Sequence, residues 1–236
     1  MDLSIINYIF NSSFNTPHKT RKTRIKMIIL DGKKEQDLIK CKEIIMNGGI
    51  IVYPTDTIYG LGCDPYNKEA VAKIFRLKNR FLGKPLPILT FDFSHIEKIM
   101  ILNENGRKLA NSFWPGPLTI VGTLNDNDIP KIITAGKQTI GMRIPNKIET
   151  LNLLKHCNYL VGTSANISNE KSCFYANEVI KSHLVGYDAI LIGEEKKSNI
   201  PFSLKGSTIV DASTSNITIL REGVIKSETI YEILYQ

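Results

Sequence analysis

The sequence lacks several patterns that would assign a function directly. Its 236 residues contain no run of 18 consecutive apolar residues, so no membrane-spanning helix is expected. There is no G-x-x-x-x-G-K-[ST] phosphate loop and no G-x-S-x-G nucleophile elbow, which argues against a P-loop nucleotidase and an α/β-hydrolase. The four histidines show no metal-ligand spacing. Any site must therefore be built from other residue types.

Cysteine is scarce, and acidic residues are fewer than basic ones. Four scattered cysteines without a C-x-x-C pair are interpreted as reduced thiols of an intracellular, cytoplasmic protein, with disulfides the less favoured alternative. The net charge is +7. Such mild basicity suits anionic ligands such as nucleotides, with RNA a weaker candidate.

The first 26 residues differ from the rest of the chain. They hold five Lys and Arg residues against a single acid, Asp2, and show no sustained hydrophobic period. We predict that residues 1–26 are a disordered extension or a misassigned start. A single catalytic domain is then expected over residues 27–236.

From residue 27 onward, apolar runs alternate with helical patterns, which predicts an α/β (or α+β-like) fold. Several connections are too short for crossovers, so a mixed sheet is expected. Strands are predicted at 27–30, 50–53, 87–90, 118–124, 140–144, 159–163, 189–192, 208–210 and 217–220, and helices at 35–47, 68–78, 103–113, 148–156 and 174–184.

The stretch PTDTIYGLG at 54–62 follows the apolar run 49–53. Pro54 cannot donate to a sheet ladder and ends the strand. The two threonine hydroxyls after it can bond a polar ligand, and Gly60 and Gly62 let the backbone approach that ligand closely. This order predicts a small-molecule site in a loop at the end of a strand.

Cations gather at one predicted helix end, where Lys78, Arg80 and Lys84 lie within seven residues. One of them alone would merely complement the helix dipole, but three together before a strand favour a polyanion site. Arg143 lies inside an apolar strand with no acid close in sequence, and a buried arginine needs a partner. We favour a ligand carboxylate or phosphate over an aspartate from elsewhere in the chain.

Further polar motifs stand at strand boundaries, although each alone could be a simple turn. Together the motifs resemble the YrdC-like family of threonylcarbamoyl-adenylate synthases, in its short, single-domain form. The matched pieces span roughly residues 35–225 in the family's order and are PTDTIYGLG (54–62), KNR with Lys84 (78–84), FWPGPLT (113–119), TAGKQTIGMRIP (134–145), TSAN (163–166), GSTIVD (206–211) and LREG (220–223).

The resemblance implies a twisted open mixed α/β sheet with a concave, basic face. It also implies a reaction in which L-threonine, bicarbonate (or CO2) and ATP give threonylcarbamoyl-AMP and pyrophosphate. The product would supply a downstream tRNA threonylcarbamoyltransferase that modifies adenosine 37 of tRNA. Mg2+ would act through the triphosphate of ATP, with no metal ligand from the protein.

The resemblance further implies which residues form the site. Leu89 stands where some longer members place a histidine on threonine. Lys78, Arg80, Ser164 and Asn166 complete the Lys-x-Arg and Ser-x-Asn motifs and carry the catalytic role. The threonine-contacting positions are Thr57, Arg143, Gly162 and Ser207, and the ATP-contacting positions are Arg80, Lys84, Thr139, Ser164, Ser172 and Arg221.

No histidine or carboxylate in these motifs suits strong acid–base catalysis unless Asp56 serves, so positioning and charge stabilisation are expected. Two alternatives remain. One is a basic RNA-binding module of the same fold without catalysis, which the few aromatic residues in the polar motifs disfavour. The other is a paralogue that uses a different amine or carbamoyl donor.

Overall fold

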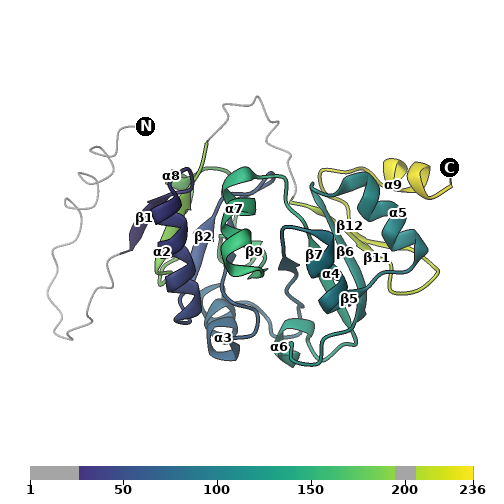
Figure 1. Ribbon diagram of the computed structural model, residues 1–236, viewed down its shortest axis with the longest axis horizontal. Coiled ribbons are helices and arrows are strands. Elements are labelled where there is room, and N and C mark those ends of the chain that lie inside the picture. The colour runs from purple at the N-terminus through teal and green to yellow at the C-terminus, as the bar shows by residue number, and fades with distance from the viewer. Residues whose placement is uncertain (1–26, 195–205, 236) are drawn as a thin grey trace, which may run out of the picture.

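The computed structural model describes residues 27–194 and 206–235, so the prediction for residues 1–26 lies outside the described residues. The strands form two mixed sheets (Figure 1). In the first sheet β1, β10 and β2 run parallel, while β3 pairs antiparallel with both β2 and β9. In order across this sheet, the strands are β1 (Ile28–Asp31), β10 (Ala189–Ile192), β2 (Ile51–Tyr53), β3 (Gly60–Gly62) and β9 (Thr163–Ser164).

The second sheet is larger and also mixed. β11 runs parallel to β6 and β4 runs parallel to β7, whereas its other pairs are antiparallel. Its strands in order are β12 (Thr218–Arg221), β11 (Thr208–Asp211), β6 (Leu118–Leu124), β7 (Thr139–Arg143), β4 (Ile88–Leu89) and β8 (Leu160–Val161), with β5 (Met100–Ile101) paired to β6 off this path.

Helices flank both sheets. α2 packs on α7 and contacts the strands of the first sheet, whereas α5 packs on β6 and on α9 at the other end of the molecule (Figure 1). No helix in the described ranges is long and apolar enough to cross a membrane. The helices are α2 (Glu35–Met46), α3 (Lys68–Leu77), α4 (Phe93–Ile99), α5 (Glu104–Phe113), α6 (Lys131–Thr134), α7 (Ile148–Cys157), α8 (Ala176–Lys181) and α9 (Ser227–Tyr235).

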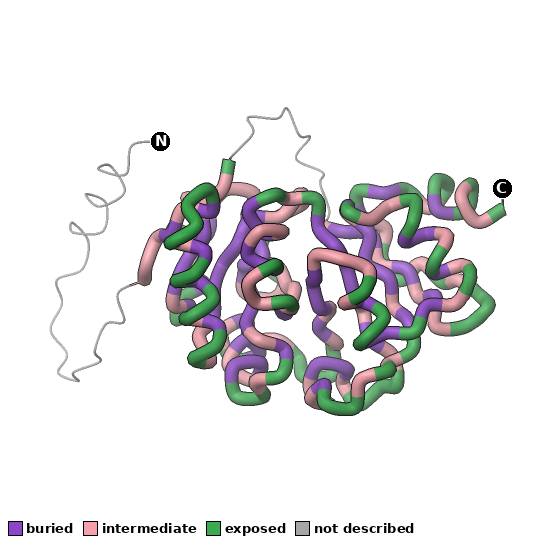
Figure 2. Tube along the Cα trace, viewed as in Figure 1, coloured by how far each residue is buried: buried purple, intermediate pink, exposed green. Residues whose placement is uncertain are grey.

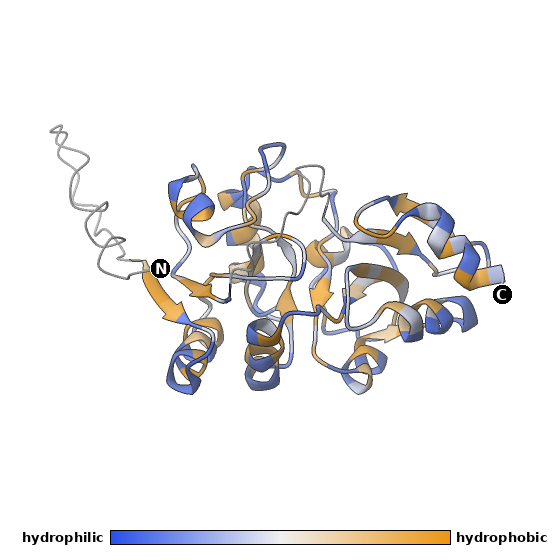
Figure 3. Cartoon of the chain, turned by 90° about the horizontal axis from the view of Figure 1, so that it is seen from above, coloured by the Kyte–Doolittle hydropathy of each residue, from blue (hydrophilic) through white to orange (hydrophobic). Residues whose placement is uncertain are grey.

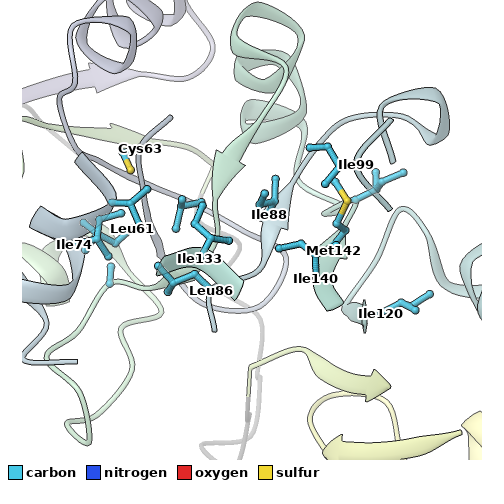
Figure 4. Packing of buried hydrophobic residues seen from close by; sticks show 14 of the residues in the cluster. Leu61, Cys63, Ile74, Leu86, Ile88, Ile99, Ile120, Ile133, Ile140 and Met142 are labelled. Carbon is cyan, nitrogen blue, oxygen red and sulfur yellow. The ribbon is translucent and has the colours of Figure 1, made fainter. Parts of the chain in front are cut away.

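The two sheets share one hydrophobic core. Buried stretches run through the strands of both (Figure 2), and the same strands are the most hydrophobic parts of the chain (Figure 3). Figure 4 shows side chains from β3 and α3 on one side of this core and from β6 and β7 on the other. The residues labelled there are Leu61, Cys63, Ile74, Leu86, Ile88, Ile99, Ile120, Ile133, Ile140 and Met142. Apolar burial therefore holds the sheets against each other.

Local signals placed most of the elements correctly. Asn67 caps α3, as predicted, because its side-chain oxygen accepts a hydrogen bond from the N–H of Ala70 at 2.9 Å. The α/β class with mixed sheets and flanking helices is confirmed, with the strands divided between two sheets. The sequence did not predict α4, α6 or α9, and the 174–184 helix is shorter than predicted, at Ala176–Lys181.

Gly60 and Gly62 have a different role from the predicted one. They form strand β3 instead of a ligand loop, and the ring of Tyr53 packs against them. A Cβ on Gly60 would lie 2.6 Å from that ring, and one on Gly62 would collide with the carbonyl oxygen of Val161. Tyr53 in turn donates its hydroxyl to this carbonyl at 2.8 Å. The glycines thus allow close packing between strands and an aromatic ring.

All four cysteines carry free thiols, as the scattered spacing predicts. Three of them are buried, and burial raises the pKa of the Cys41 thiol to about 12. A high pKa keeps this thiol protonated and unreactive near neutral pH.

Candidate functional site

The loop after β2 is braced by one side chain. The Thr55 hydroxyl donates to the carbonyl of Ile58 at 2.5 Å and accepts from the N–H groups of Thr57 and Ile58 at 3.1 and 3.2 Å. Thr150 donates to the carbonyl of Pro54 and ties the loop to α7. The Thr55 hydroxyl, expected from the sequence to bond a ligand, is therefore used by the loop itself. It holds the adjacent Asp56 and Thr57 in place.

Arg143, at the end of β7, has a partner in the protein. Its Nη2 lies 2.5 Å from Oδ1 of Asp56, with only 6% and 13% of the two side chains exposed. Its Nε donates to the carbonyl of Gly116 at 2.9 Å, and its Nη1 to the hydroxyl of Thr57 at 3.3 Å. Burial lowers the pKa of Arg143, and the carboxylate of Asp56 opposes that shift.

This pairing corrects the interpretation of Arg143 as an arginine that only a ligand could neutralise. Asp56 supplies the charge from 87 residues away, a distance along the chain over which local sequence gives no signal. The guanidinium still has room for a ligand. Each terminal nitrogen carries two N–H groups, and the described residues take one from each. One N–H therefore remains on Nη1 and one on Nη2.

Leu89 lies between Gly162 and Arg143. Leu89 of β4 is the register partner of Arg143, and a Cβ added to Gly162 would lie 2.9 Å from the Leu89 side chain. Gly162 also donates its N–H to the carbonyl of Pro87 at 2.8 Å. The predicted threonine-contacting positions 143 and 162 are thus separated by the leucine that stands where longer family members have a histidine.

Ser207 links the part of the site around Arg143 to Arg221. The Nε and Nη2 of Arg221 donate to the carbonyl of Ser207 at 3.1 and 2.6 Å. The Ser207 hydroxyl pairs with that of Thr119 at 2.9 Å. A Cβ on Gly206 would lie 3.3 Å from Arg221 Nη2 and 3.5 Å from the side chain of Ile58. The loop after β2 and the start of β11 therefore meet where the two sheets approach each other.

The arginines of the two predicted subsites share one electrostatic neighbourhood. Burial lowers the pKa of Arg80, and the charge of Arg221 lowers it further. The pKa of Arg221 is lowered in the same way, by desolvation of its guanidinium against Ser207 and then by the charge of Arg143. Arg80 itself donates to the carbonyls of Pro85 and Lys84, at 2.8 and 3.3 Å. The fold thus gathers Arg80, Arg221 and Arg143, which lie far apart in the sequence.

Lys78 is almost completely buried, with 1% of its surface exposed. Its ammonium donates to the backbone carbonyls of Ser164 and Asn166, and its own carbonyl accepts from the N–H of Ser168 at 2.8 Å. Burial, followed by the charge of Arg80, lowers the pKa of Lys78 to about 7. Lys78 therefore joins the end of α3 to the segment 164–168 through three hydrogen bonds, and its ammonium faces carbonyl oxygens.

The Ser-x-Asn motif is shaped by this contact. Ser164 lies in β9 opposite Gly60, and the side-chain nitrogen of Asn166 donates to the carbonyls of Ile167 and Glu170, both at 2.8 Å. Lys78, Ser164 and Asn166 are thus brought together as the sequence predicted, but through backbone carbonyls.

Three predicted ATP-contacting residues have no side-chain hydrogen bond or ion pair with the arginines in the described ranges. Lys84 is exposed, and only its backbone carbonyl accepts from Arg80. Thr139 and Ser172 are half-buried. Their role with ATP stays a prediction.

Sequence reasoning gave too little weight to two residues. Asp56 was considered only as a base, although it lies inside the PTDTIYGLG motif, and Thr119 was matched within FWPGPLT without a role. A polar residue inside a matched motif was the available signal for both. The described residues contain no group of three His, Cys, Asp or Glu side chains placed to hold a metal ion.

Comparison with known proteins identifies relatives of the whole domain. A family model described as "Telomere recombination", covering Sua5, YciO and YrdC, matches residues 43–223. A protein of Methanocaldococcus jannaschii is 36% identical over 205 residues, which is 85% of this chain and 93% of that protein. The threonylcarbamoyl-AMP synthase of Buchnera aphidicola is 37% identical over 145 residues, covering 58% of this chain and 81% of the relative.

Solved structures have the same fold. P. abyssi Sua5, in a crystal structure with L-threonine, matches with a TM-score of 0.79 at 29% identity over 88% of this chain. The present chain spans only 60% of that longer protein. E. coli YciO matches with a TM-score of 0.73 at 26% identity, over 86% of this chain and 97% of YciO.

Proposed function

Because the chain belongs to the Sua5, YciO and YrdC family, we propose that it is an L-threonylcarbamoyladenylate synthase. It makes threonylcarbamoyl-AMP and pyrophosphate from L-threonine, bicarbonate or CO2, and ATP. The observation that carries the proposal is that Arg143, bonded to Thr57, and Arg221, bonded to Ser207, are brought together where Gly206 meets Ile58, with the charge of Arg80 acting on Arg221. An amino acid and a triphosphate need an arginine for the carboxylate beside cationic groups for the phosphates.

The amino acid half of the site is formed by Thr57, Arg143, Gly162 and Ser207. Arg143 takes the substrate carboxylate through the N–H groups that the described residues leave on its terminal nitrogens. The hydroxyls of Thr57 and Ser207 accept from Nη1 of Arg143 and Nη2 of Arg221, both at 3.3 Å. A relative's structure with bound L-threonine supports threonine as the amino acid.

The nucleotide half is formed by Arg80, Arg221 and Lys84, together with Ser164, Ser172 and Thr139. The arginines donate to backbone carbonyls and keep their full charge for phosphate oxygens. Lys78 and Asn166 contribute by fixing the segment that carries Ser164. Mg2+ would come with ATP, held by the phosphate oxygens of the nucleotide.

The protein promotes the reaction mainly by holding the substrates in position. The threonine ammonium loses a proton to water, the free amine adds to CO2, and loss of a second proton to water gives the carbamate. A carbamate oxygen then attacks the α-phosphorus as pyrophosphate leaves. The arginines stabilise the charge that develops on the phosphate oxygens, which is the main contribution a protein makes to phosphoryl-type transfer. The product passes to a tRNA threonylcarbamoyltransferase, and a cytoplasmic location is part of the proposal.

The test is incubation of the full chain with ATP, Mg2+, bicarbonate and labelled threonine. The expected result is a labelled adenylate and pyrophosphate release that depends on both threonine and bicarbonate. Omitting each in turn gives the controls. Threonine-independent pyrophosphate release, or RNA affinity that falls steeply with salt while no adenylate forms, would overturn the proposal in favour of the RNA-binding alternative.

A further inference from the structure

Asp56 has features that the proposed reaction has not yet used. It is a nearly buried carboxylate in direct contact with the arginine assigned to the substrate carboxylate. We propose that Asp56 binds the α-ammonium group of the amino acid, so that Arg143 and Asp56 together recognise a zwitterion. This inference rests on the proposed function, because it assigns a second binding residue to the same substrate.

Charge complementarity is the first argument. A free α-amino acid carries a carboxylate and an ammonium on the same carbon atom, so its site needs a cation and an anion side by side. Arg143 and Asp56 are such a pair, 2.5 Å apart and largely screened from water. A lone arginine would accept any small carboxylate, whereas this pair repels a ligand that brings a carboxylate without a compensating cation.

The second argument is that both members of the pair have unused bonding capacity. Oδ2 of Asp56 is buried, and no residue in the described ranges donates to it. On the other side, Arg143 keeps one N–H on each terminal nitrogen. Buried polar groups without partners are rare in native proteins and are accepted where a ligand completes them. The pair lacks one donor and two acceptors, which the ammonium group and the two carboxylate oxygens of an amino acid supply.

The third argument is that the loop holds Asp56 in this position. Thr55 bonds to Thr57 and Ile58 on either side of the loop tip, and Thr150 anchors Pro54. Rotation about the Cβ–Cγ bond of an aspartate is soft and roughly two-fold. The carboxylate can therefore keep one oxygen on Arg143 and turn the other toward a ligand while the backbone stays in place.

The consequence is that Asp56 determines specificity. The amine that must react is held by a carboxylate next to Arg143, and ligands without the amine are disfavoured. Asp56 is thus a binding residue for the nucleophile of the proposed reaction.

A double comparison of protein and ligand tests this. L-Threonine and (R)-3-hydroxybutyrate, which is threonine without its amine, are titrated into the wild-type chain and into Asp56→Asn, with dissociation constants followed by protein NMR. Loss of a charged hydrogen bond should weaken L-threonine binding by about 10- to 100-fold in the variant. Binding of (R)-3-hydroxybutyrate should not weaken by more than about 2-fold and should become tighter, because asparagine still accepts from Arg143 while the charge that repels a lone carboxylate is removed.

Three other results would overturn the inference. Equal weakening of both ligands means that Asp56 only orients Arg143. Tighter binding of both means that it competes with the substrate carboxylate. Unchanged binding of both means that it is not part of the site. The wild-type chain alone supplies a further test that requires no variant: equal affinity for the two ligands excludes an ammonium-binding residue.

The matched control is Asp128→Asn, which removes the same charge from an exposed position. It should leave both dissociation constants unchanged, and circular dichroism melts check that both variants fold. Failure of the proposed function remains distinguishable. If the wild-type chain binds no L-threonine and forms no adenylate, the function fails. If it binds threonine but the double comparison shows no selective loss, only the role of Asp56 fails.

Discussion

On the amino acid side of the site, Arg143 is paired with the carboxylate of Asp56 at 2.5 Å, whereas on the nucleotide side Arg80 and Arg221 donate to backbone carbonyls. A carboxylate neutralises the charge of its partner, while a carbonyl orients a guanidinium and leaves its charge intact. In the described ranges, neither Arg80 nor Arg221 forms an ion pair. The first region is therefore nearly neutral and suits a zwitterion, and the second stays cationic and suits a polyanion.

The difference shows that the group an arginine bonds to within the protein determines which ligand charge that arginine suits. Lys78 extends the pattern on the nucleotide side, since it also faces carbonyls and not a carboxylate. Its burial shows the cost of an unneutralised charge, because its pKa is lowered to about 7. The buried arginine with a carboxylate partner avoids part of that cost.

Breaking the neutral pair should have the largest effect. Replacing Arg143 by Met leaves the carboxylate of Asp56 buried without a partner, which typically costs about 3–5 kcal/mol. Urea unfolding of Arg143→Met should show a loss of this size. The double variant Arg143→Met with Asp56→Asn should recover much of it. An Arg143→Met protein as stable as wild type would show that the pair is not a coupled unit.

Removing a charge from the cationic region should affect catalysis more than stability. Arg80→Ala should reduce pyrophosphate release by about 100-fold or more, because an aligned charge on the phosphates is lost. The fold should survive, since Arg80 is half-buried and bonds only to its own loop. Arg76→Ala, an exposed arginine one helical turn earlier, is the matched control and should keep full activity. Near-normal turnover by folded Arg80→Ala would remove Arg80 from the site.

Lys78 tests the nucleotide side separately, because its ammonium bonds to buried carbonyls of the protein. Lys78→Met fills a similar volume but leaves the carbonyls of Ser164 and Asn166 without their donor, which should destabilise the protein by about 1–2 kcal/mol. ATP affinity should fall while L-threonine affinity is retained, because only the 164–168 segment is released. Isothermal titration with each ligand measures this, with Lys68→Met, an exposed lysine at the start of the same helix, as a control for loss of charge alone. Equal loss of both affinities would contradict a role confined to the nucleotide side.

The burial of Lys78 also predicts a pH dependence of stability. The folded-state pKa of Lys78, about 7, lies below the ordinary lysine value, so between these two values the unfolded chain binds the extra proton. The free energy of unfolding of wild type relative to Lys78→Met should therefore rise as the pH increases from about 7 toward 10. Urea melts of both proteins at several pH values measure the difference. A difference that stays constant across this range would show that Lys78 remains protonated in the folded protein.

How much the sequence revealed depended on whether the signal was local. Asn67 and its helix, or the strand at 118–124, could be predicted because a cap and a hydrophobic period lie within a few residues of each other. The four-residue helix α6 and the strand Gly60–Gly62 were missed because neither is long enough to show a period. The prediction for Arg143 was half right. The sequence showed that this buried arginine needs a partner, but it did not show that the partner is Asp56.

The amino-acid sequence by itself determined where most of the longer elements lie and that polar motifs stand at strand boundaries, since capping, proline and hydrophobic spacing act over a few bonds. The tertiary structure alone decided that Asp56 meets Arg143, that the ring of Tyr53 covers Gly60 and Gly62, and that the ammonium of Lys78 faces two carbonyls. These contacts join residues from different elements. Their geometry follows from how two sheets pack on a shared core, which no short stretch of sequence encodes.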